Sequence, residues 1–350
     1  MPTLADYRIP EFQEDLVSWG FKPSHAGRVL RRYFEAAGRV PWDELRVPGA
    51  LRERLARERA EFSSSVVSRQ TASDGTVKLL LRYPDGRSVE AVMMSDYRED
   101  RVAGCLSTQA GCAMGCDFCA TAQGGLERNL TPGEIVEQFL RLRSEAAAVG
   151  KTLRTIVFMG MGEPMHNYDA VLEAVRRIGG AELGALGWRQ LTVSTVGVVA
   201  GIDRLATEGL RVNLAVSLHA PDDETRAHLL PTGRRFAIGD ILAAADRYQA
   251  ASGLPVIVQY CLLKDVNDSP AQAAMLADLL SRRRMHVNLL HYNPTGPGLS
   301  GRSYEACPLE RMDEFIAVLR SRGVVAHFRR PRGRDIAAAC GQLRAGEARV

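Results

Sequence analysis

Three cysteines stand close together in the segment Cys112-Ala113-Met114-Gly115-Cys116-Asp117-Phe118-Cys119. Their spacing is C-x3-C-x2-C, on a stretch that follows a candidate strand at Gly104–Gln109. Thiolates are the standard ligands of iron–sulfur clusters. Three thiolates can bind three irons of a [4Fe–4S] cluster and leave the fourth iron without a protein ligand. The spacing therefore predicts Cys112, Cys116 and Cys119 as cluster ligands.

An open iron of this kind has a specific chemical use. It can bind the amino and carboxyl groups of S-adenosylmethionine and pass an electron to the sulfonium, which releases a 5′-deoxyadenosyl radical. Two other interpretations of the segment remain, a structural zinc site and a chance group of buried cysteines. Zinc normally takes four ligands, commonly in paired C-x2-C units. Here one such pair stands without a nearby His or Cys to complete a tetrahedron, so the spacing favours radical chemistry.

Outward from this segment, short β-rich runs alternate with helical patterns from about residue 103 onward. Such alternation indicates an α/β fold of parallel strands joined by crossover helices. Six or seven strands are too few for a closed eight-stranded barrel, so we expect a partial (β/α)6 barrel. The candidate strands are Gly104–Gln109, Thr155–Gly160, Gln190–Thr195, Val212–Leu218, Pro255–Leu262, His286–Tyr292 and Gly323–Arg329.

Polar or glycine-rich segments follow most of these strands, where the active sites of parallel α/β barrels lie. After Thr155–Gly160 comes Met159-Gly160-Met161-Gly162-Glu163-Pro164, whose glycines permit close backbone approach. Glu163 can accept hydrogen bonds from a cationic amino group, although a plain strand-to-helix turn is the alternative. Other polar residues at strand ends are Ser194, Ser217, His219 and Asn293. Each alone has a structural explanation, and their shared position favours a common pocket.

The first hundred residues lack this alternation of strands and helices. Helical patterns at 11–19, 26–37 and 51–62 predict a small helical domain over 1–64. Alternating apolar residues on either side of Pro84-Asp85-Gly86 predict a β-hairpin extension within 65–102. The catalytic partial barrel is then expected over 103–343, with a short C-terminal tail at 344–350.

The bulk composition limits the class of protein. The chain has 350 residues and a formal net charge of +4, which permits an anionic partner without requiring one. No run approaches the roughly 18 apolar residues of a membrane span, and the N-terminus lacks the pattern of a signal peptide. Seven cysteines in such a chain are ligands, catalysts or buried side chains rather than a disulfide framework. We therefore expect a cytoplasmic protein without a membrane partner.

A further cysteine, Cys340, is flanked by alanines and a glycine that leave its sulfur uncrowded. The alternative is that Cys340 is a small buried apolar side chain, as most free cysteines are. The arginines that precede it would suit contacts with RNA phosphates, although charge runs are usually solvated surface. Cys261 and Cys307 are interpreted as non-functional. The arginines are Arg329, Arg330, Arg332 and Arg334.

With these motifs in view, the sequence resembles the RlmN/Cfr family of radical methyltransferases, which methylate adenine in RNA. The resemblance spans the chain from the helical N-terminus to Gln342. The segments that carry it are GCAMGCDFCATAQGG, ERNLTPGEI, FMGMGEPMHN, VSTVGV, SLHAPDDETR, VNDS, YNPTGPG and RGRDIAAACGQL. The last of these resembles the C2-methylating branch more than the C8-methylating one.

The resemblance implies site residues and cofactors. It implies a [4Fe–4S] cluster and two S-adenosylmethionine molecules per turnover, with Cys340 becoming S-methylcysteine. It implies Glu90 as proton acceptor and Cys105 as a second cysteine that forms a disulfide with Cys340 during product release. The residues that match the family's S-adenosylmethionine contacts are Gly162, Glu163, Ser194, Ser217, Leu218, His219 and Asn293.

The resemblance also implies the reaction and the partners. The expected product is an adenosine methylated at C2 in 23S rRNA, and in tRNA for some relatives, formed through a covalent RNA–protein thioether. C8 methylation of the same adenosine is the alternative, and an activating enzyme for another protein is a more distant one. The N-terminal helices would bind RNA, an external donor such as flavodoxin would supply electrons, and the protein would be a monomer.

Overall fold

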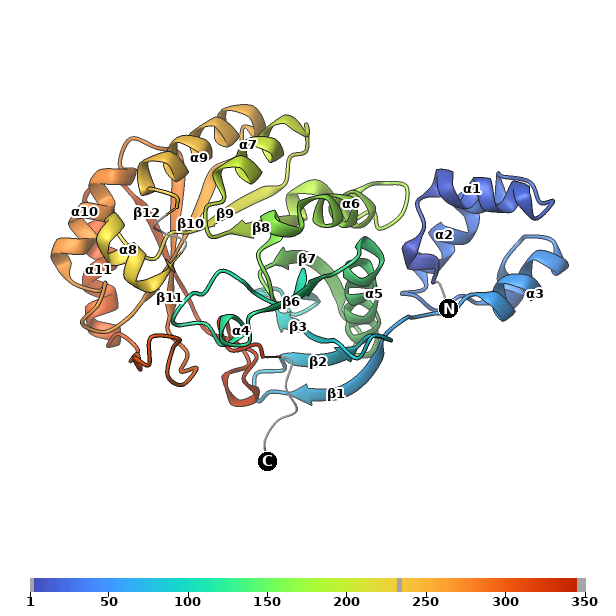
Figure 1. Ribbon diagram of the computed structural model, residues 1–350, viewed down its shortest axis with the longest axis horizontal. Coiled ribbons are helices and arrows are strands. Elements are labelled where there is room, and N and C mark those ends of the chain that lie inside the picture. Colours follow the sequence, from blue (N-terminus) through green and yellow to red (C-terminus); the bar gives the residue numbers. More distant parts are fainter. Residues whose placement is uncertain (1–2, 232–234, 345–350) are drawn as a thin grey trace.

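The computed structural model describes residues 3–231 and 235–344 of the chain. A ten-stranded sheet within these residues has the order β1-β2-β3-β4-β7-β8-β9-β10-β11-β12. Figure 1 shows the sheet curving around the centre of the molecule, with the crossover helices on its outer side. The edge strands β1 (Ser65–Thr71) and β12 (Val325–Arg329) are not paired with each other in the described residues, so the sheet is open.

The parallel part of the sheet confirms the predicted α/β fold. Each neighbouring pair from β4 to β12 runs parallel. The strands are β4 (Arg101–Cys105), β7 (Thr152–Phe158), β8 (Leu191–Thr195), β9 (Asn213–Ser217), β10 (Val256–Leu262), β11 (Met285–His291) and β12. The helices that follow them are α5 (Pro132–Ala148), α6 (Tyr168–Gly179), α7 (Val199–Thr207), α8 (Asp223–Leu229), α9 (Ile238–Ser252), α10 (Pro270–Leu280) and α11 (Leu309–Ser321).

The first parallel strand ends earlier than the predicted Gly104–Gln109. It stops at Cys105, and residues 109–111 form a separate strand β5 that pairs with β6 (Leu126–Asn129). The cause lies at Ser107, whose backbone N–H donates to the Gln138 side chain and whose hydroxyl donates to the Glu90 carbonyl. Because side-chain and carbonyl groups, rather than a neighbouring strand, form the hydrogen bonds of Ser107, the chain leaves the sheet before the cysteine segment.

Three antiparallel strands precede the parallel ones. The predicted hairpin is formed by β2 (Val77–Arg82) and β3 (Ser88–Ser95), which pair on either side of the 84–86 turn. Strand β1 pairs antiparallel with β2, and β3 pairs antiparallel with β4. The extension is therefore continuous with the catalytic sheet.

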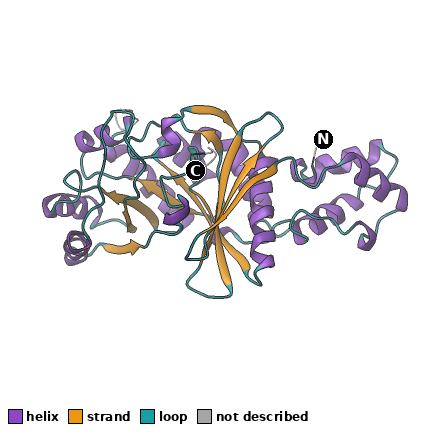
Figure 2. Ribbon diagram, turned by 90° about the horizontal axis from the view of Figure 1, so that it is seen from below, coloured by secondary structure: helices purple, strands orange, loops and turns teal. Residues whose placement is uncertain are grey.

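The N-terminal helices are α1 (Ile9–Ser18), α2 (His25–Glu35) and α3 (Gly49–Glu58), as the sequence predicts within a few residues. Apolar faces pack together around the fully buried Phe12, Leu30 and Tyr33. Figure 2 shows these helices at one end of the molecule, beyond the sheet. The buried carboxylate of Glu137 on α5 accepts hydrogen bonds from the backbone and hydroxyl groups of Ser63 and Ser64, which fixes the connection between the two parts.

The division into domains at residues 64, 102 and 343 stays a prediction. Of the predicted tail, Arg344 is described, and 345–350 lie outside the described residues. Short 3-10 helices complete the chain at Leu4–Asp6, Trp42–Glu44, Pro164–Asn167, Trp188–Gln190 and Arg334–Ile336. No helix among the described residues combines the length and apolar character needed to cross a membrane.

Candidate active site

The cysteine segment lies between β5 and the short helix α4 (Ala120–Gln123), inside the curve of the sheet (Figure 1). The Cys112 N–H donates to the Gly125 carbonyl at 2.8 Å, and the Asp117 N–H donates to the Leu229 carbonyl at 2.9 Å. The Asp117 carboxylate is buried and accepts hydrogen bonds from the hydroxyls of Ser300 and Tyr304, both at 2.6 Å. The loop is thus held by the residue before β6, by the last residue of α8 and by the segment after β11.

The donor set of this loop fits an iron–sulfur cluster. Burial raises the pKa of Cys112 to about 12, and burial together with the charges of Cys119 and Cys112 raises that of Cys116 well above its ordinary value. A cluster needs these groups as thiolates, and the positive charge of bound iron would favour that form. Within the described residues no three His, Cys, Asp or Glu side chains converge as ligands of one metal ion. In a cluster, by contrast, each thiolate binds its own iron.

Glu163 is a buried carboxylate at the carboxyl end of β7. Its Oε1 accepts the Met165 N–H at 2.9 Å and its Oε2 accepts the Val196 N–H at 2.8 Å. Burial raises the pKa of Glu163 to about 7, and the hydrogen bonds to its oxygens partly oppose the shift. At neutral pH this group can therefore exist as a carboxylate with lone pairs left for a cationic ligand.

Gly162 fixes the turn that presents Glu163. Its φ is +101°, and a Cβ there would approach the Gln109 Cβ at 2.6 Å, so a larger residue does not fit. The Gln109 side chain in turn accepts the Glu163 N–H at 2.7 Å. The sequence did not single out this contact, because Gln109 was expected to end a strand rather than to support the turn of Glu163.

The other residues expected to contact S-adenosylmethionine lie at the carboxyl ends of β8, β9 and β11. Ser194 and Ser217 are half-buried within their strands, and Leu218 and His219 follow β9. Asn293, two residues after β11, uses its side chain to donate to the Cys340 carbonyl at 3.3 Å and to accept from Arg334 at 2.9 Å.

His219 has a left-handed backbone, with φ of +60°. Burial, and then the nearby Arg226, lower its pKa to about 3, so the ring is neutral at physiological pH. Its Nδ1 accepts the Cys261 N–H at 2.9 Å, which places the ring proton on Nε2. The ring also lies edge-on to Phe118 at 5.0 Å between centroids. His219 is therefore a fixed neutral donor beside the cysteine segment.

Cys340 lies next to the cysteine segment, although more than two hundred residues separate them in the sequence. The Ala120 N–H, directly after Cys119, donates to the Gly341 carbonyl at 2.7 Å. The Thr121 hydroxyl donates to the Leu343 carbonyl at 2.7 Å. The structure thus brings the loop of Cys340 against α4, directly after the three cysteines of the segment.

Cys105 is buried at the end of β4, and burial raises its pKa to about 12, with a further increase from the charge of Cys340. Both thiols are free in the structure. The structure therefore does not support the disulfide between Cys105 and Cys340 that the resemblance implied, although it places the two residues near one another.

Glu90 is buried on β3, with 3% of its surface exposed. Its Oε1 forms an ion pair with the Lys78 Nζ at 2.9 Å, and its Oε2 accepts the Arg344 N–H at 2.8 Å. Lys78 was not singled out in the sequence, where its place in an alternating strand indicates only that it faces away from Val77 and Leu79.

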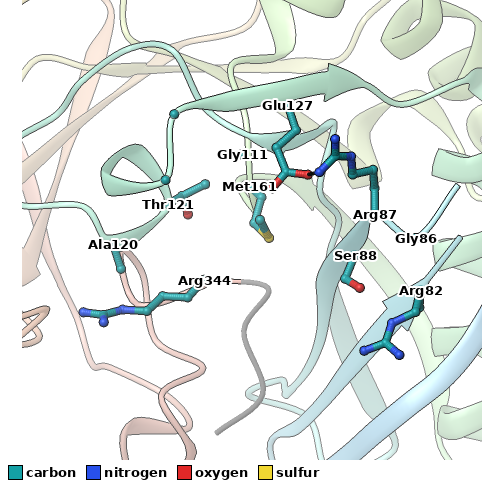
Figure 3. A pocket seen from close by; sticks show the side chains of 12 residues that line it. Arg82, Gly86, Arg87, Ser88, Gly111, Ala120, Thr121, Glu127, Met161 and Arg344 are labelled. Atoms are coloured by element: carbon teal, nitrogen blue, oxygen red, sulfur yellow. Dashed lines mark ion pairs between the residues drawn. The ribbon is translucent and has the colours of Figure 1, made fainter. Parts of the chain in front are cut away.

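A cleft of about 450 Å³ opens beside these residues, between the hairpin and α4. Figure 3 shows Arg82, Arg87 and Arg344 around it, with Arg87 paired to Glu127. Its remaining lining includes Gly111 and Gly125.

The fold and the three-cysteine loop define a radical SAM protein, and residues 106–277 match the family model described as the Radical SAM superfamily. Over 98% of its length the chain is 63% identical to a probable dual-specificity RNA methyltransferase RlmN 1 of Opitutus terrae, 97% of which is covered. It is 44% identical to a probable dual-specificity RNA methyltransferase RlmN of Salinispora tropica, over 98% of this chain and 93% of that one.

A crystal structure of a radical SAM methyltransferase from Sphaerobacter thermophilus has a TM-score of 0.92 and 42% identity, covering 99% of this chain and 100% of that one. The chain therefore belongs to the RlmN family of dual-specificity RNA methyltransferases, which confirms the family resemblance of its motifs.

Proposed function

We propose that this protein methylates C2 of adenosine in 23S rRNA and in tRNA, with Cys340 as the methyl carrier. The observation that carries the proposal is the hydrogen bond between the Ala120 N–H and the Gly341 carbonyl. It joins the residue after the last cluster cysteine to the residue after Cys340. A thiol at this position lies close enough to react with a radical that forms at the cysteine segment.

Cys112, Cys116 and Cys119 would hold the [4Fe–4S] cluster, and Glu163 would accept hydrogen bonds from the amino group of S-adenosylmethionine. When bound, this pair supplies the 5′-deoxyadenosyl radical, with the electron delivered by an external donor such as flavodoxin. The half-buried Ser194 and Ser217, with the Nε2–H of His219, add polar groups at the same strand ends. Leu218 is fully buried beside them and excludes water.

The reaction needs a carbon radical because C2 of adenine lies between two nitrogens and is electron-poor, so it does not attack a methyl sulfonium. Cys340 first takes a methyl group on its sulfur from one S-adenosylmethionine, which leaves as S-adenosylhomocysteine, and the thiol proton is released. The 5′-deoxyadenosyl radical from a second S-adenosylmethionine would then take one hydrogen atom from that methyl group and become 5′-deoxyadenosine. The remaining carbon radical adds to C2 and joins RNA to protein through a thioether. This covalent intermediate divides one difficult step into easier ones.

The residues around Cys340 would complete the reaction. Glu90 would accept the proton from C2, as its buried carboxylate next to the Cys340 loop allows. Cys105 would attack the Cys340 sulfur, so that a disulfide forms only in the course of turnover while the released methylene carbon takes up a proton and becomes the methyl group of the RNA. Both cysteines are free in the structure, and the charge of Cys340 contributes to the raised pKa of Cys105. The arginines of the cleft in Figure 3 would bind phosphates on either side of the target nucleotide.

The test is a nucleoside assay on both RNAs. The anaerobically reconstituted protein is incubated with S-adenosylmethionine, dithionite and unmodified transcripts of 23S rRNA or tRNA, and the digested nucleosides are analysed by mass spectrometry. We expect 2-methyladenosine from both transcripts. Methylation at C8 alone would place the chain with the C8-methylating relatives. If neither RNA is methylated although S-adenosylmethionine is cleaved, the proposal is wrong.

A further inference from the structure

Lys78 and Glu90 form an ion pair that is almost fully removed from solvent. The N–O distance is 2.9 Å, and the two side chains are 11% and 5% exposed. In the β2–β3 register Leu80 lies opposite Glu90 and Lys78 lies opposite Val92, so Lys78 is the diagonal neighbour of Glu90 on the same face. Burying two charges costs desolvation that an apolar pair would avoid. Fold stability alone is therefore a weak reason for this pair.

The same ammonium group also reaches the loop of Cys340. The Lys78 Nζ donates to the Ala337 carbonyl at 3.2 Å, three residues before Cys340. Ala337 has a left-handed backbone with φ of +50°, where the carbonyl direction differs from that of a helix. On the other side of Cys340, the Arg344 N–H donates to Glu90. The ion pair thus contacts the loop both before and after its cysteine.

The turn between β1 and β2 holds the beginning of this loop. The Asp74 carboxylate accepts the Gly333 N–H at 3.0 Å, and the Ser73 N–H donates to Asp335 at 2.8 Å. A Cβ on Gly333 would approach Thr76 Cγ2 at 2.8 Å, so the two backbones are close. The loop position relative to β2 and β3 is therefore well defined, and Lys78 lies at the point where the loop meets Glu90.

We propose that Lys78 is a positioning residue that aims the carboxylate of Glu90 and ties it to the loop that carries Cys340. In the step concerned, the adduct radical would return one electron to the cluster, and the C2–H bond of the RNA–Cys340 adduct then breaks. Its proton passes to Glu90 and its electron pair stays in the purine ring. The ammonium of Lys78 keeps the carboxyl group of Glu90 directed while that adduct is present. The inference rests on the proposed function, in which Glu90 is the proton acceptor.

The test uses Lys78→Met and Lys78→Arg in the full-length reconstituted protein, with a 23S rRNA transcript as substrate. Cluster content, methylation of Cys340, the covalent protein–RNA adduct on a denaturing gel, and methylated nucleoside are measured separately. In Lys78→Met we expect methylated RNA to fall about tenfold or more, while Cys340 methylation persists and adduct accumulates. Lys78→Arg, which retains the charge, should recover most of the activity.

A matched control is Lys264→Met, because Lys264 forms a 2.7 Å ion pair with Glu305 on the surface. Its RNA methylation and its Cys340 methylation should equal those of the wild-type protein. If methionine prevents folding or cluster binding, Lys78→Gln repeats the test with a donor for the Ala337 carbonyl and no charge. The double variant Lys78→Met/Glu90→Gln should be no slower than Glu90→Gln alone, because Lys78 acts through Glu90.

Unchanged RNA methylation in Lys78→Met would overturn the role of Lys78. So would a fall in RNA methylation that is matched by an equal fall in Cys340 methylation. A third contradicting result is a double variant whose rate loss is the product of the losses in the two single variants. Failure of the proposed function gives a different result. In that case the unmodified protein itself produces no methyladenosine.

Discussion

Two sulfur-bearing loops meet at the mouth of the sheet, and they are held in different ways. The cluster loop, residues 112–119, places three thiols within eight residues and is fixed by backbone bonds to Gly125 and Leu229 and by its own Asp117 side chain. The carrier loop, residues 333–344, has one thiol and, besides its backbone bond from Ala120, is fixed by side chains that come from elsewhere in the chain. Those side chains are Asp74, Lys78, Glu90 and Asn293.

The difference shows which parts of the sequence the two proposed activities, cluster binding and methyl transfer, depend on. Cluster binding needs only that a short loop presents its thiols together, so it depends on local spacing. Methyl transfer through Cys340 needs that thiol to stand against α4 and beside Glu90, and this depends on the antiparallel extension. In the proposed mechanism the extension is therefore part of the active site.

Removing one sulfur from each loop should separate the two chemistries, with complete loss of methylation in both cases. Cys116→Ala should lose the cluster absorbance and every S-adenosylmethionine-derived product. Cys340→Ala should keep the cluster and lose methylated RNA below detection, because the methyl carrier is gone. Cluster absorbance and nucleoside analysis measure both effects, with Cys307→Ala as the control for loss of a buried thiol far from the loops' hydrogen bonds. Full methylation by Cys340→Ala would contradict the carrier assignment.

This contrast explains how much the sequence could predict. The cysteine spacing, the strand and helix order and the 84–86 turn are local patterns, and each has its counterpart in the structure. The contacts of Lys78 and Gln109 are not local. An alternating strand shows that Lys78 faces away from the apolar side chains, but not that residues 333–344 cover it. Gln109 was misplaced because Ser107 ends the strand through side-chain hydrogen bonds.

On the cluster side, Glu163→Gln should weaken S-adenosylmethionine binding about 10- to 100-fold, the value of one charge-assisted hydrogen bond. Equilibrium binding to the cluster-loaded protein measures this. Glu305→Gln, at an exposed carboxylate, serves as the control and should leave binding unchanged. Equal binding by Glu163→Gln would remove Glu163 from the site.

The raised pKa of Glu163 also predicts a pH dependence of stability. A carboxyl group with a pKa near 7 in the folded chain, against an ordinary 4.5, holds its proton more tightly when folded. Its contribution is complete below about pH 4.5 and is lost as the pH rises through about 7, a fall of about 3 kcal/mol. Denaturant unfolding of the metal-free protein should show this fall, and Glu163→Gln should show less of it. A parallel pH profile in the two proteins would contradict the assigned cause.

In the loop of Cys340, Asp335→Asn should have the smallest effect, about a two- to tenfold slower methylation of Cys340, because it weakens one exposed hydrogen bond donated by the Ser73 N–H. The rate is measured by mass spectrometry of the Cys340 peptide. Asp278→Asn, which disrupts a surface ion pair with Arg322, is the matched control. An unchanged rate in Asp335→Asn would show that the remaining contacts position the loop without this bond.

The most direct test of methyl transfer through Cys340 uses S-adenosylmethionine with a fully deuterated methyl group. Because the methyl group on Cys340 loses one hydrogen atom before it adds to adenine, the product 2-methyladenosine should carry two deuterium atoms, with the third hydrogen from another source. Retention of all three deuterium atoms would mean direct transfer without the carrier radical, and would contradict the account.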